Sequence, residues 1–530
     1  MYSNDKGVDP EGASTFGQTT GPVWARAQAA TNIDRRLLAL LTLGLIAALT
    51  IIPAGRVTAQ TFTTLHSFTA ATNGGPPYYF VTNSDGVQPW GRLVTNSSGK
   101  TLYGTAKFGG SWGDGAIFAV NIDGTGFTNL YSFTANIGPG YTDYTNSDGA
   151  YPIAGLVLSG RTLYGTTRAG GTHKAGTVFA VDTDGTGFTN LHSFIGSDGA
   201  TPEAELILSG NTLYGTTTAG TVFAINTDGT GFTNLYRFTA GGYDPSNGLT
   251  NSDGAYPDAG FILSGNTLYG TAEQGGSSGA GTVFAINTDG TGFTNLHTFT
   301  ALSIGPPYPR TNNGGGAPVA GLILFGNTLY GTTYTGGSSG NGTVFALHTN
   351  GTGFTTLHNF TALLSNTNSD GANPNAGLVV SGNTLYGTGV SGGSSGRGTV
   401  FAINTDGSGF TTLHSCAGGD GAGPHTGLIL SGNALYGAAL QGGSSGNGTV
   451  FSISFRPQLT IVPSGTNVIL SWPISYAGFS SAGYYLQDTV DLLSPAGWSA
   501  ADPFLPTIIN GQLTVTRPML GPQRSYRLSQ

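Results

Sequence analysis

Histidine is the first residue type to consider for chemistry, because five histidines recur in one local sequence. They lie in segments of the type FTNLHSF, at His66, His192, His297, His358 and His414. Imidazole is a common metal ligand, so five equivalent copies raise the question of a metal-binding ring. Tyr131 and Tyr236 take the same position in two further segments, and one such residue per repeat is typical of packing between strands. We therefore predict packing and no metal site.

Acidic turns are the second candidate for metal chemistry. Residues 182–187 read Asp-Thr-Asp-Gly-Thr-Gly, which is similar to the start of a calcium-binding loop, and related NTDGTG segments recur. A complete loop also needs a distal carboxylate that binds calcium through both oxygens, and the FTNLHSF segment that follows has none. Asp-Gly is common in tight hairpins. We predict hairpin turns and no cofactor, with calcium in these turns as the alternative.

Catalytic groups are scarce in this sequence. The chain has no nucleophile elbow, phosphate-binding loop or HExxH motif, and Glu203, Glu205 and Glu273 are isolated from one another. Glycoside hydrolysis needs a pair of carboxyl groups, and the recurring aspartates lie in turns. The one thiol, Cys416, takes a place that phenylalanine fills in other copies, so we predict a small buried side chain. We assign no catalytic residue and expect a protein that is not an enzyme.

These residues belong to a repeat that is used seven times. The motif TLYG ends at Gly104, Gly165, Gly215, Gly270, Gly331 and Gly387, and the variant ALYG ends at Gly437. Around each copy, GLILSG-like, TLYGT, GTVFAIN and FTNLHSF segments follow in that order. All are rich in β-branched and aromatic residues and are bounded by turn residues, so each predicts a strand. In residues 281–287, apolar side chains face both sides, as expected for a strand between two sheets.

The repeat predicts an all-β fold, a seven-bladed β-propeller over residues 60–455. The segment Phe62–Phe68 precedes the first complete unit, and Gly448–Ser454 has no fourth strand after it. We expect the N-terminal strand to complete the seventh blade and so close the ring, which removes the open sheet edges. An open β-solenoid is the alternative. Residues 457–530 differ in composition and predict a small β-sandwich similar to fibronectin type III, with Trp472 and Trp498 in its core.

Composition and the N-terminal segment indicate an exported protein. Charged residues make up only 8% of the chain and the net charge is −8, which argues against nucleic acid as a partner. Arg35 and Arg36 precede the apolar run Leu37–Ile52 and the small-residue segment Val57-Thr58-Ala59. This order is typical of a signal peptide, so residues 1–59 are predicted to be a leader that is cleaved after Ala59. An uncleaved membrane anchor is the alternative.

The tandem pattern LYGTT…GG…GTVFAINTDGTGFTNLHSF…SDGAxPxAGLIL resembles the GloVer repeat of exported bacterial proteins, over about residues 61–455. More loosely, LYG followed by VFAI is similar to kelch repeats. The resemblance implies a secreted or cell-surface protein and brings neither an established activity nor catalytic residues. Kelch proteins of the galactose-oxidase type use a Tyr–Cys cross-link for copper chemistry. We exclude that chemistry here, since Cys416 occupies a predicted core position.

The predicted propeller has two unlike faces. Short SGN and TDGTG turns lie on one face, and loops of variable length lie on the other. Binding sites favour variable loops on a rigid scaffold, and aromatic side chains there suit neutral partners. The ligand-binding candidates are Tyr78, Tyr79, Phe80, Trp112, Tyr141, Tyr144, Tyr243 and Tyr308, with loop packing as the alternative role.

Together these features predict an exported binding or adhesion scaffold that recognises a neutral or carbohydrate-like ligand, such as a glycan or cell-surface partner. Two alternatives stay open. One is an enzyme that acts on polysaccharide at the mouth of the propeller. The other is a purely structural cell-surface protein.

Overall fold

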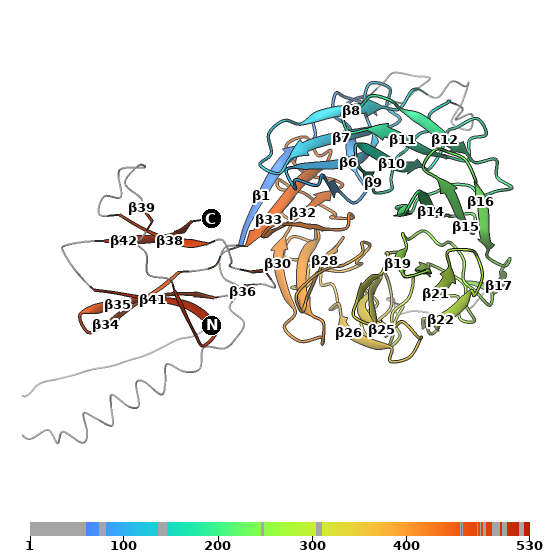
Figure 1. Cartoon of the computed structure of the whole chain (residues 1–530). Helices are drawn as coiled ribbons and strands as arrows, with labels where there is room; N and C mark the ends of the chain where they lie inside the picture. The colour runs from blue at the N-terminus through green and yellow to red at the C-terminus, as the bar shows by residue number, and fades with distance from the viewer. Residues whose placement is uncertain are drawn as a thin grey trace, which may run out of the picture. The chain divides into compact units, whose positions relative to one another are not determined.

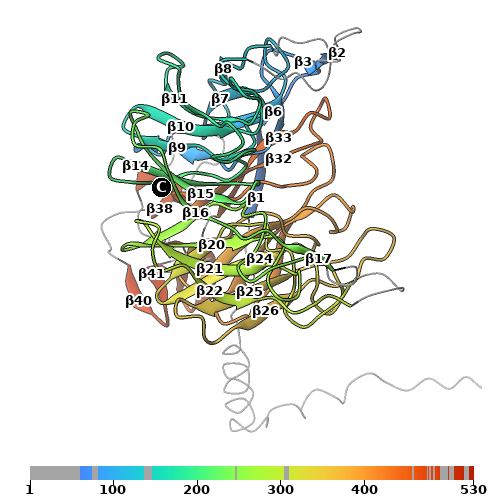
Figure 2. The ribbon, with the colours of Figure 1, turned by 90° about the vertical axis from the view of Figure 1, so that its right-hand side faces the viewer.

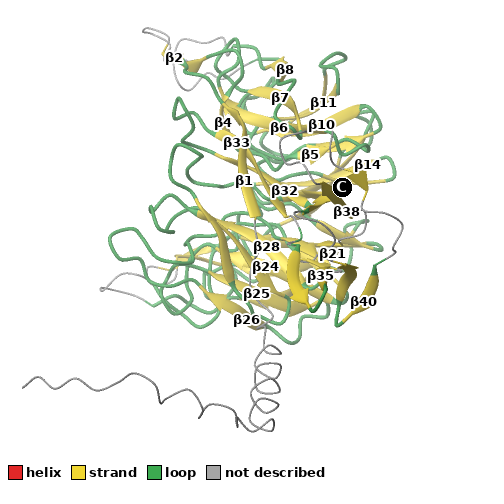
Figure 3. Cartoon of the chain, turned by 90° about the vertical axis from the view of Figure 1, so that its left-hand side faces the viewer, coloured by secondary structure: helices red, strands yellow, loops and turns green. Residues whose placement is uncertain are grey.

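The computed structural model describes residues 60–73, 81–135, 146–244, 248–303, 310–455, 457, 459–473, 475–476, 479–480, 484–489, 499–500, 506–518 and 524–529. These residues form strands and no helix, as Figure 3 shows. The predicted all-β fold class is therefore confirmed. The predicted leader, residues 1–59, lies outside the described residues.

Seven antiparallel sheets follow one another along residues 60–455, and each repeat supplies its strands in the predicted order. The first strands are β5 (Val94–Thr95), β9 (Val157–Ser159), β13 (Ile207–Ser209), β19 (Ile262–Ser264), β23 (Ile323–Phe325), β27 (Val379–Ser381) and β31 (Ile429–Ser431). The second strands are β6 (Thr101–Phe108), β10 (Thr162–Thr167), β14 (Thr212–Thr217), β20 (Thr267–Ala272), β24 (Thr328–Thr333), β28 (Thr384–Gly389) and β32 (Ala434–Ala439).

The third and fourth strands complete each sheet. The third strands are β7 (Ala116–Asn121), β11 (Thr177–Asp182), β15 (Thr221–Asn226), β21 (Thr282–Asn287), β25 (Thr343–His348), β29 (Thr399–Asn404) and β33 (Thr449–Phe455). The fourth are β8 (Thr128–Ser132), β12 (Thr189–Ser193), β16 (Thr233–Arg237), β22 (Thr294–Thr298), β26 (Thr355–Asn359) and β30 (Thr411–Ser415). The additional strand β4 (Val87–Pro89) pairs with β6. Two small hairpins join β2 (Thr72–Asn73) to β3 (Val81–Thr82) and β17 (Gly242–Asp244) to β18 (Gly248–Thr250).

The N-terminal strand β1 (Gln60–Ser67) is the fourth strand of the last sheet, whose order is β1-β33-β32-β31. It runs antiparallel to β33, from Gln60 opposite Phe455 to Ser67 opposite Thr449. Figure 1 shows β1, in blue, beside β33, in orange. This is the pairing that the sequence predicts for the segment Phe62–Phe68. It covers the outer edge of β33 with main-chain hydrogen bonds.

The third strands are buried on both faces, as predicted. In β21, Val283, Phe284 and Ile286 are fully buried and Ala285 is 7% exposed. A strand without a polar face must pack between two other layers, because each face needs apolar neighbours. The hydrophobic clusters supply them, since each contains side chains from two successive sheets.

The sheets pack in chain order. Figure 2 shows the sheet of β14–β16 beside the sheet of β20–β22, and one cluster joins Ala224 of the first to Phe284 of the second. The other clusters connect the remaining neighbours in the same way. One of them joins Val450 of β33 to Val120 of β7, so the last sheet packs against the first.

Short turns connect the third and fourth strands. In the turn after β21, the N–H of Asn287 donates to the carbonyl of Thr291 at 2.9 Å, and Gly290 adopts a φ of 83°. Oδ1 of Asp289 accepts from the N–H and the hydroxyl of Thr291, at 2.9 and 2.7 Å. The aspartate thus stabilises its own turn, as predicted for the NTDGTG segments.

The C-terminal residues form further antiparallel strands. One sheet has the order β34 (Thr460–Ser464), β35 (Asn467–Pro473), β41 (Gln512–Pro518), β40 (Thr507–Ile509). Another has the order β39 (Ser499–Ala500), β38 (Tyr485–Thr489), β42 (Ser525–Ser529), and β36 (Ser475–Tyr476) pairs with β37 (Phe479–Ser480). Leu470, Trp472, Leu486 and Val515 form a buried cluster. Trp472 is thus a core residue, and Trp498 lies outside the described residues.

Candidate functional site

One position in the repeat differs in all seven copies and brings its side chains to a single cavity. It is the residue after the proline in the segment that crosses from one sheet to the first strand of the next. The after-proline residues are Trp90, Ile153, Glu203, Asp258, Val319, Asn375 and His425. All seven line one cavity of about 280 Å³. The two positions that follow it are alanine and glycine in most copies, whereas the position before the proline varies as well.

The backbone before each proline is held in an unusual conformation. The seven preceding residues have φ between 52° and 60°, and six of them are not glycine. A left-handed conformation is uncommon for such residues and costs about 1–3 kcal/mol when the surroundings impose it. Hydrogen bonds impose it here: the N–H of Tyr151 donates to the carbonyl of Asp114 in the preceding repeat, and the N–H of Arg168 donates to the carbonyl of Tyr151. These bonds fix the direction of the after-proline side chain.

A second variable position lies next to the first. It lies two residues after the fifth residue of the TLYGT motif and is occupied by Lys107, Arg168, Thr218, Glu273, Tyr334, Val390 and Leu440. In six repeats its N–H donates to the carbonyl before the proline, which keeps the two variable side chains close together. In the first repeat, Lys107 Nζ lies 4.5 Å from the centre of the Trp90 ring, a cation–π contact.

Acidic residues gather at this cavity. The chain has only four glutamates, Glu11, Glu203, Glu205 and Glu273, and the last three line the cavity together with Asp258. These glutamates are separate in the sequence, but the fold brings them together: Glu203 and Glu205 lie in one crossing, and Glu273 follows β20 of the next sheet. In a chain with so few charged residues, this concentration marks the cavity as unlike the rest of the molecule.

Two ion pairs neutralise part of that charge. Arg168 Nε lies 2.8 Å from Glu203 Oε1, and Arg92 Nη1 lies 3.5 Å from Glu205 Oε2. Both pairs are partly exposed, and such pairs contribute little to stability. Burial raises the pKa of the Glu203 carboxyl, and the charges of Arg168 and Lys107 counteract that rise.

Asp258 has no such cation as a close partner. Its Oδ1 atom is buried and has no hydrogen-bond partner. Burial is the main cause that raises the pKa of Asp258 to about 7; the charges of Glu203 and Glu273 raise it further, and Thr218 and the charge of Arg168 offset part of the rise. The carboxyl group therefore exchanges its proton near neutral pH. It can donate a hydrogen bond when protonated and accept one when ionised.

Neutral polar and aromatic groups form another part of the lining. Asn375 Nδ2 lies 2.6 Å from His425 Nδ1, and the rings of Trp90 and His425 are 5.0 Å apart. Burial, with the charge of Lys107, lowers the pKa of His425 to about 4. The imidazole is therefore neutral at physiological pH. Since the Asn375 amide donates to Nδ1, the remaining imidazole proton lies on Nε2.

Two residues after the after-proline residue, five repeats have glycine, and the crossings approach one another closely there. A Cβ atom on Gly321 would lie 2.9 Å from the carbonyl oxygen of Gly260, and one on Gly377 would lie 3.1 Å from that of Gly321. Arg92 and Glu205 replace glycine in the other two repeats and form their ion pair here. A second cavity of about 470 Å³, lined by first strands such as β13, shares both residues.

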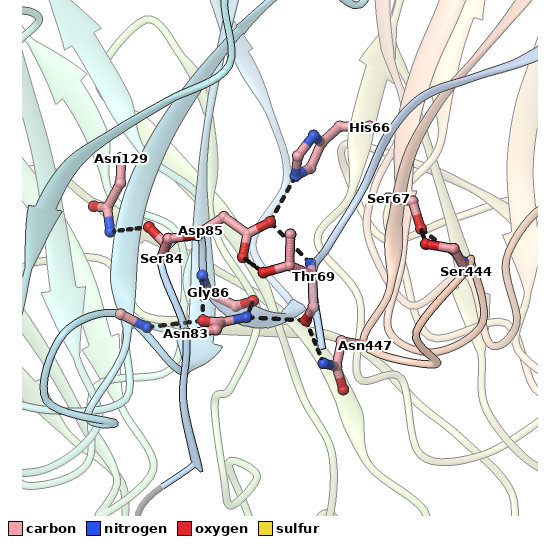
Figure 4. A network of polar contacts seen from close by, with 11 residues as sticks. His66, Ser67, Thr69, Asn83, Ser84, Asp85, Gly86, Asn129, Ser444 and Asn447 are labelled. Carbon is pink, nitrogen blue, oxygen red and sulfur yellow. Dashed lines mark hydrogen bonds and ion pairs between the residues drawn. The ribbon is translucent and has the colours of Figure 1, made fainter. Parts of the chain in front are cut away.

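A different set of polar contacts recurs five residues before six of the seven after-proline residues. These crossing carboxylates are Asp85, Asp148, Asp198, Asp253, Asp370 and Asp420. Figure 4 shows the first: Asp85 Oδ2 lies 3.0 Å from His66 Nε2 and accepts from the N–H of Thr69 at 2.9 Å, and Oδ1 accepts from the Thr69 hydroxyl. Asn83 stabilises the same loop, because its Nδ2 donates to the carbonyl of Gly86 and its Oδ1 accepts from the N–H of Gly86. The carboxylate thus ties the end of β1 to the crossing.

The recurring histidines and tyrosines are partners of these carboxylates. His192, His358 and His414 bind Asp198, Asp370 and Asp420 at 2.8–2.9 Å, and the hydroxyls of Tyr131 and Tyr236 donate to Asp148 and Asp253 at 2.8 Å. Each ring also stacks on a phenylalanine of the next sheet; for example, His66 lies 3.7 Å from Phe127. In the described part of the chain, no group of three His, Cys, Asp or Glu residues could hold a metal ion.

The eight predicted ligand-binding aromatics are not gathered at this cavity as far as the structure describes them. Trp112, between β6 and β7, is 53% exposed, and Tyr243, in β17, is 79% exposed. Neither lines the cavity. The remaining six lie outside the described residues: Tyr78, Tyr79, Phe80, Tyr141, Tyr144 and Tyr308. Cys416 is buried, and burial raises the pKa of its thiol to about 12, so it has little thiolate character.

The after-proline residues were not among the predicted site residues, because the loops that contain them were compared by length. The signal was present in a comparison of single positions: the proline recurs in all seven crossings, Ala-Gly follows Xaa in four of them, and Xaa changes in every copy. Within the described ranges, no helix has the length and apolar character needed to cross a membrane.

Several solved structures, of different kinds of protein, show some similarity to this chain. BamB from Moraxella catarrhalis is 15% identical over 76% of this chain and all of its own, with a TM-score of 0.40. The computationally designed Ika8 protein is 16% identical over 70% of this chain and 97% of its own, with a TM-score of 0.37. A chain of a nidogen/laminin complex is 15% identical over 57% of this chain and 90% of its own, with a TM-score of 0.34. No curated protein matches the chain significantly.

A family model matches the repeats directly. The Gloeobacter/Verrucomicrobia repeat matches residues 140–256, 247–361 and 308–468, which together span more than half of the chain. The matched segments contain the TLYG, GTVFAIN and Pro-Xaa-Ala-Gly motifs from which the sheets and the cavity are built. The chain belongs to the Gloeobacter/Verrucomicrobia repeat family.

Proposed function

We propose that the protein is an exported, non-enzymatic binding or adhesion scaffold that takes a neutral or carbohydrate-like ligand at the cavity of the after-proline residues. One observation carries the proposal: the after-proline residue differs in every repeat, and all seven copies line one cavity. A repeat that served only as a scaffold would have no need of seven different side chains at equivalent places.

The chemistry of the lining favours a polyhydroxylated ligand. Ion pairs with Arg92 and Arg168 offset two of the acidic charges, so the cavity is less anionic than its carboxylates suggest. Asp258, Asn375 and the Nε2 proton of His425 offer acceptors and donors for hydroxyl groups. Trp90 adds an aromatic surface beside them. Such a mixture of apolar surface and a few convergent polar groups is typical of small-molecule sites.

The proposed architecture is a seven-bladed, kelch-like β-propeller over residues 60–455, closed by β1, with a C-terminal β-sandwich over residues 457–530. The hydrophobic clusters that join each sheet to the next, and the last sheet to the first, support the propeller. On this fold the cavity would lie at the mouth, on the face that carries the variable loops. Trp112 and Tyr243, exposed in loops of that face, would extend the surface for a longer glycan.

Export rests on the sequence pattern alone. Arg35 and Arg36, the apolar run and Val57-Thr58-Ala59 predict a signal peptide that is cleaved after Ala59, and secreted or cell-surface placement follows. Sequencing the N-terminus of the protein from an expressing bacterium tests this. Mature protein that begins at Gln60 supports export by cleavage, and a chain that keeps residues 1–59 contradicts it.

A glycan array with the purified protein tests the binding proposal, followed by titration of any bound glycan against two variants. Asp258→Asn changes the cavity, and Asp406→Asn makes the same change in an exposed hairpin turn. We expect Asp258→Asn to weaken binding at least tenfold and Asp406→Asn to leave it unchanged. Absence of binding across the array, or equal effects of both variants, would contradict the proposal and favour a purely structural role.

An enzyme that acts on polysaccharide is the second candidate, and Asp258 favours it. A carboxyl group with a pKa of about 7 beside Glu203 and Glu273 has the properties of a general acid that works near neutral pH, and glycoside hydrolysis uses two carboxyl groups. Release of reducing ends from a polysaccharide panel tests this candidate. Turnover that Asp258→Asn and Glu203→Gln both abolish would support it, and binding without turnover would exclude it.

A further inference from the structure

One of the seven crossings lacks its carboxylate. Between β22 and β23 the position of the crossing aspartate is occupied by Gly314. The equivalence is structural as well as sequential. Thr343 Oγ1 donates to the carbonyl of Gly314 at 3.4 Å, as Thr399 Oγ1 donates to that of Asp370 at 3.2 Å.

The loop around Gly314 keeps the asparagine hydrogen bonds that are found in the other crossings. Asn312 Nδ2 donates to the carbonyl of Thr300 at 2.8 Å and to that of Gly315 at 2.8 Å. Asn368 makes the corresponding bonds, at 3.0 and 2.7 Å, in the crossing that contains Asp370. Around Gly314 the described residues therefore keep these hydrogen bonds, and the crossing differs in its carboxylate.

The donors that bind a carboxylate elsewhere are all present. His297 stacks on Phe354 with the ring centres 3.9 Å apart and the planes 5° apart, and His358 stacks on Phe410 at 3.8 Å and 8°. Thr300 follows His297 by three residues, as Thr361 follows His358. Asp370 accepts hydrogen bonds from His358 and from the amide and hydroxyl of Thr361.

In the described part of the chain, the His297 ring and the N–H and hydroxyl of Thr300 have no hydrogen-bond partner; of Thr300, only the carbonyl is engaged. Burial lowers the pKa of His297, as expected for an imidazole without a neighbouring carboxylate. Residues 301–313 contain no aspartate or glutamate, so this crossing cannot supply the acceptor from its own sequence.

We propose that His297 and Thr300 bind a carboxylate group that another molecule supplies, in the place that aspartate fills in the other crossings. The other six crossings have a carboxylate at this place, and a His and Thr pair binds it in two of them, through His66 and Thr69 and through His358 and Thr361. Hydrogen bonds to an ionised acceptor are the stronger kind. Thr300 is exposed, so the site opens to solvent. A Cβ atom on Gly314 would meet Phe354 no closer than 3.4 Å, so there is room for the ligand beside the glycine.

Two sources share this chemistry: a small free carboxylate, and an acidic sugar within a glycan. Acetate and glucuronate probe them, with glucose as the neutral control and chloride at equal ionic strength. We expect acetate to raise the Tm of the full chain in a saturable way, with a dissociation constant in the millimolar range. A response to glucuronate that saturates at least tenfold lower than the response to acetate would assign the site to acidic sugars, and equal responses would assign it to small carboxylates.

Three variants make the test specific. Gly314→Asp supplies the carboxylate from within, and His297→Phe keeps the stack on Phe354 but removes the imidazole donor, so we expect both to lose the acetate response. Asp370→Gly creates a second site of the same kind, and we expect acetate to restore part of the Tm that it loses. If acetate acts on Asp370→Gly but not on the parent chain, or acts equally on Gly314→Asp, the proposal is wrong.

A spectroscopic measurement keeps the test independent of stability. In protein with isotope-labelled histidine, acetate should shift the imidazole signals that His297→Phe removes, with the same midpoint as the Tm response. If those signals do not move at acetate concentrations that saturate the Tm response, the carboxylate binds elsewhere. The cavity of the after-proline residues is not part of this site, so a failure here leaves the proposed function untouched.

Discussion

Asp253 and Asp258 lie five residues apart in the same crossing, but the first position is nearly constant among the repeats and the second is variable. Asp253 is 4% exposed and accepts hydrogen bonds from Tyr236 and from Thr239. Aspartate recurs at its position in six crossings. Asp258 has a buried oxygen without a hydrogen-bond partner, and its position holds seven different residues. The first carboxylate is part of the scaffold, and the second lies where the scaffold is free to vary.

This difference separates stability from function within a single loop. A group that folding needs is satisfied by the chain, because a buried polar group without partners costs free energy. A group kept for a ligand is left incompletely satisfied, and burial perturbs its pKa. Variants that break the scaffold contacts should therefore lower stability, whereas variants that alter the cavity should change ligand binding.

Removal of β1 should have the largest effect. Deleting residues 60–67 exposes the edge of β33 and removes both His66, which binds Asp85, and Phe62, which stacks on His414 at 3.8 Å. We expect aggregation, or a fall in Tm of more than about 10 °C, since a whole strand is lost and the partly buried Phe62 no longer packs on the core. Thermal unfolding with light scattering measures it. A deleted chain that melts like the parent would show that the last sheet does not depend on β1.

The matched variants Asp253→Asn and Asp258→Asn test the comparison directly. We expect Asp253→Asn to lower the free energy of unfolding by about 1–3 kcal/mol, because the amide cannot accept from Tyr236 and from the Thr239 amide and hydroxyl as the carboxylate does. Asp258→Asn removes a charge that burial disfavours, so we expect unchanged or higher stability at pH 7. Urea unfolding of both variants measures the difference. Equal losses would mean that Asp258 also belongs to the scaffold.

Stability should depend on pH in opposite directions at the two kinds of position. Burial alone would raise the pKa of Asp370, but the hydrogen bonds from His358 and Thr361 outweigh it and lower the pKa below its usual value. Its contribution is therefore present above the unfolded pKa of about 3.9 and is lost as the pH falls through the lower folded value. Asp258, raised to about 7, contributes fully below the unfolded pKa and loses that contribution as the pH rises through 7.

Unfolding measured from about pH 3 to pH 8 checks both signs. Asp370→Asn should flatten the acid side of the profile, and Asp258→Asn should remove a decline between about pH 4 and pH 7. A decline that persists unchanged in Asp258→Asn would show that another group causes it.

Much of this fold could be predicted from the sequence, because each strand pattern occurs in several copies that support one another. TLYG and GTVFAIN have the period and composition of strands in seven copies, and the pairing of Phe62–Phe68 with Gly448–Ser454 follows from counting the copies. The site could be predicted less well. Glu203 and Glu273 are far apart in sequence, and only the crossing geometry, with Tyr256 and its neighbours in a left-handed conformation, brings both to one cavity. The histidines were correctly predicted to pack, but their carboxylate partners lie in loops that were considered for their length alone.

The smallest expected effect comes from Gly314→Asp, which gives the exceptional crossing the residue that six others have. The new carboxylate can accept from His297 and Thr300, and Gly314 does not require a positive φ, since only Gly315 beside it has one, at 90°. We expect a gain of about 0.5–1.5 kcal/mol in the free energy of unfolding, the usual net value of added hydrogen bonds. Gly314→Asn is the matched control, because its amide has a similar shape but is a weaker acceptor. If both variants gain equally, the benefit comes from replacing a flexible glycine, and the crossing carboxylates stabilise the scaffold less than their hydrogen bonds imply.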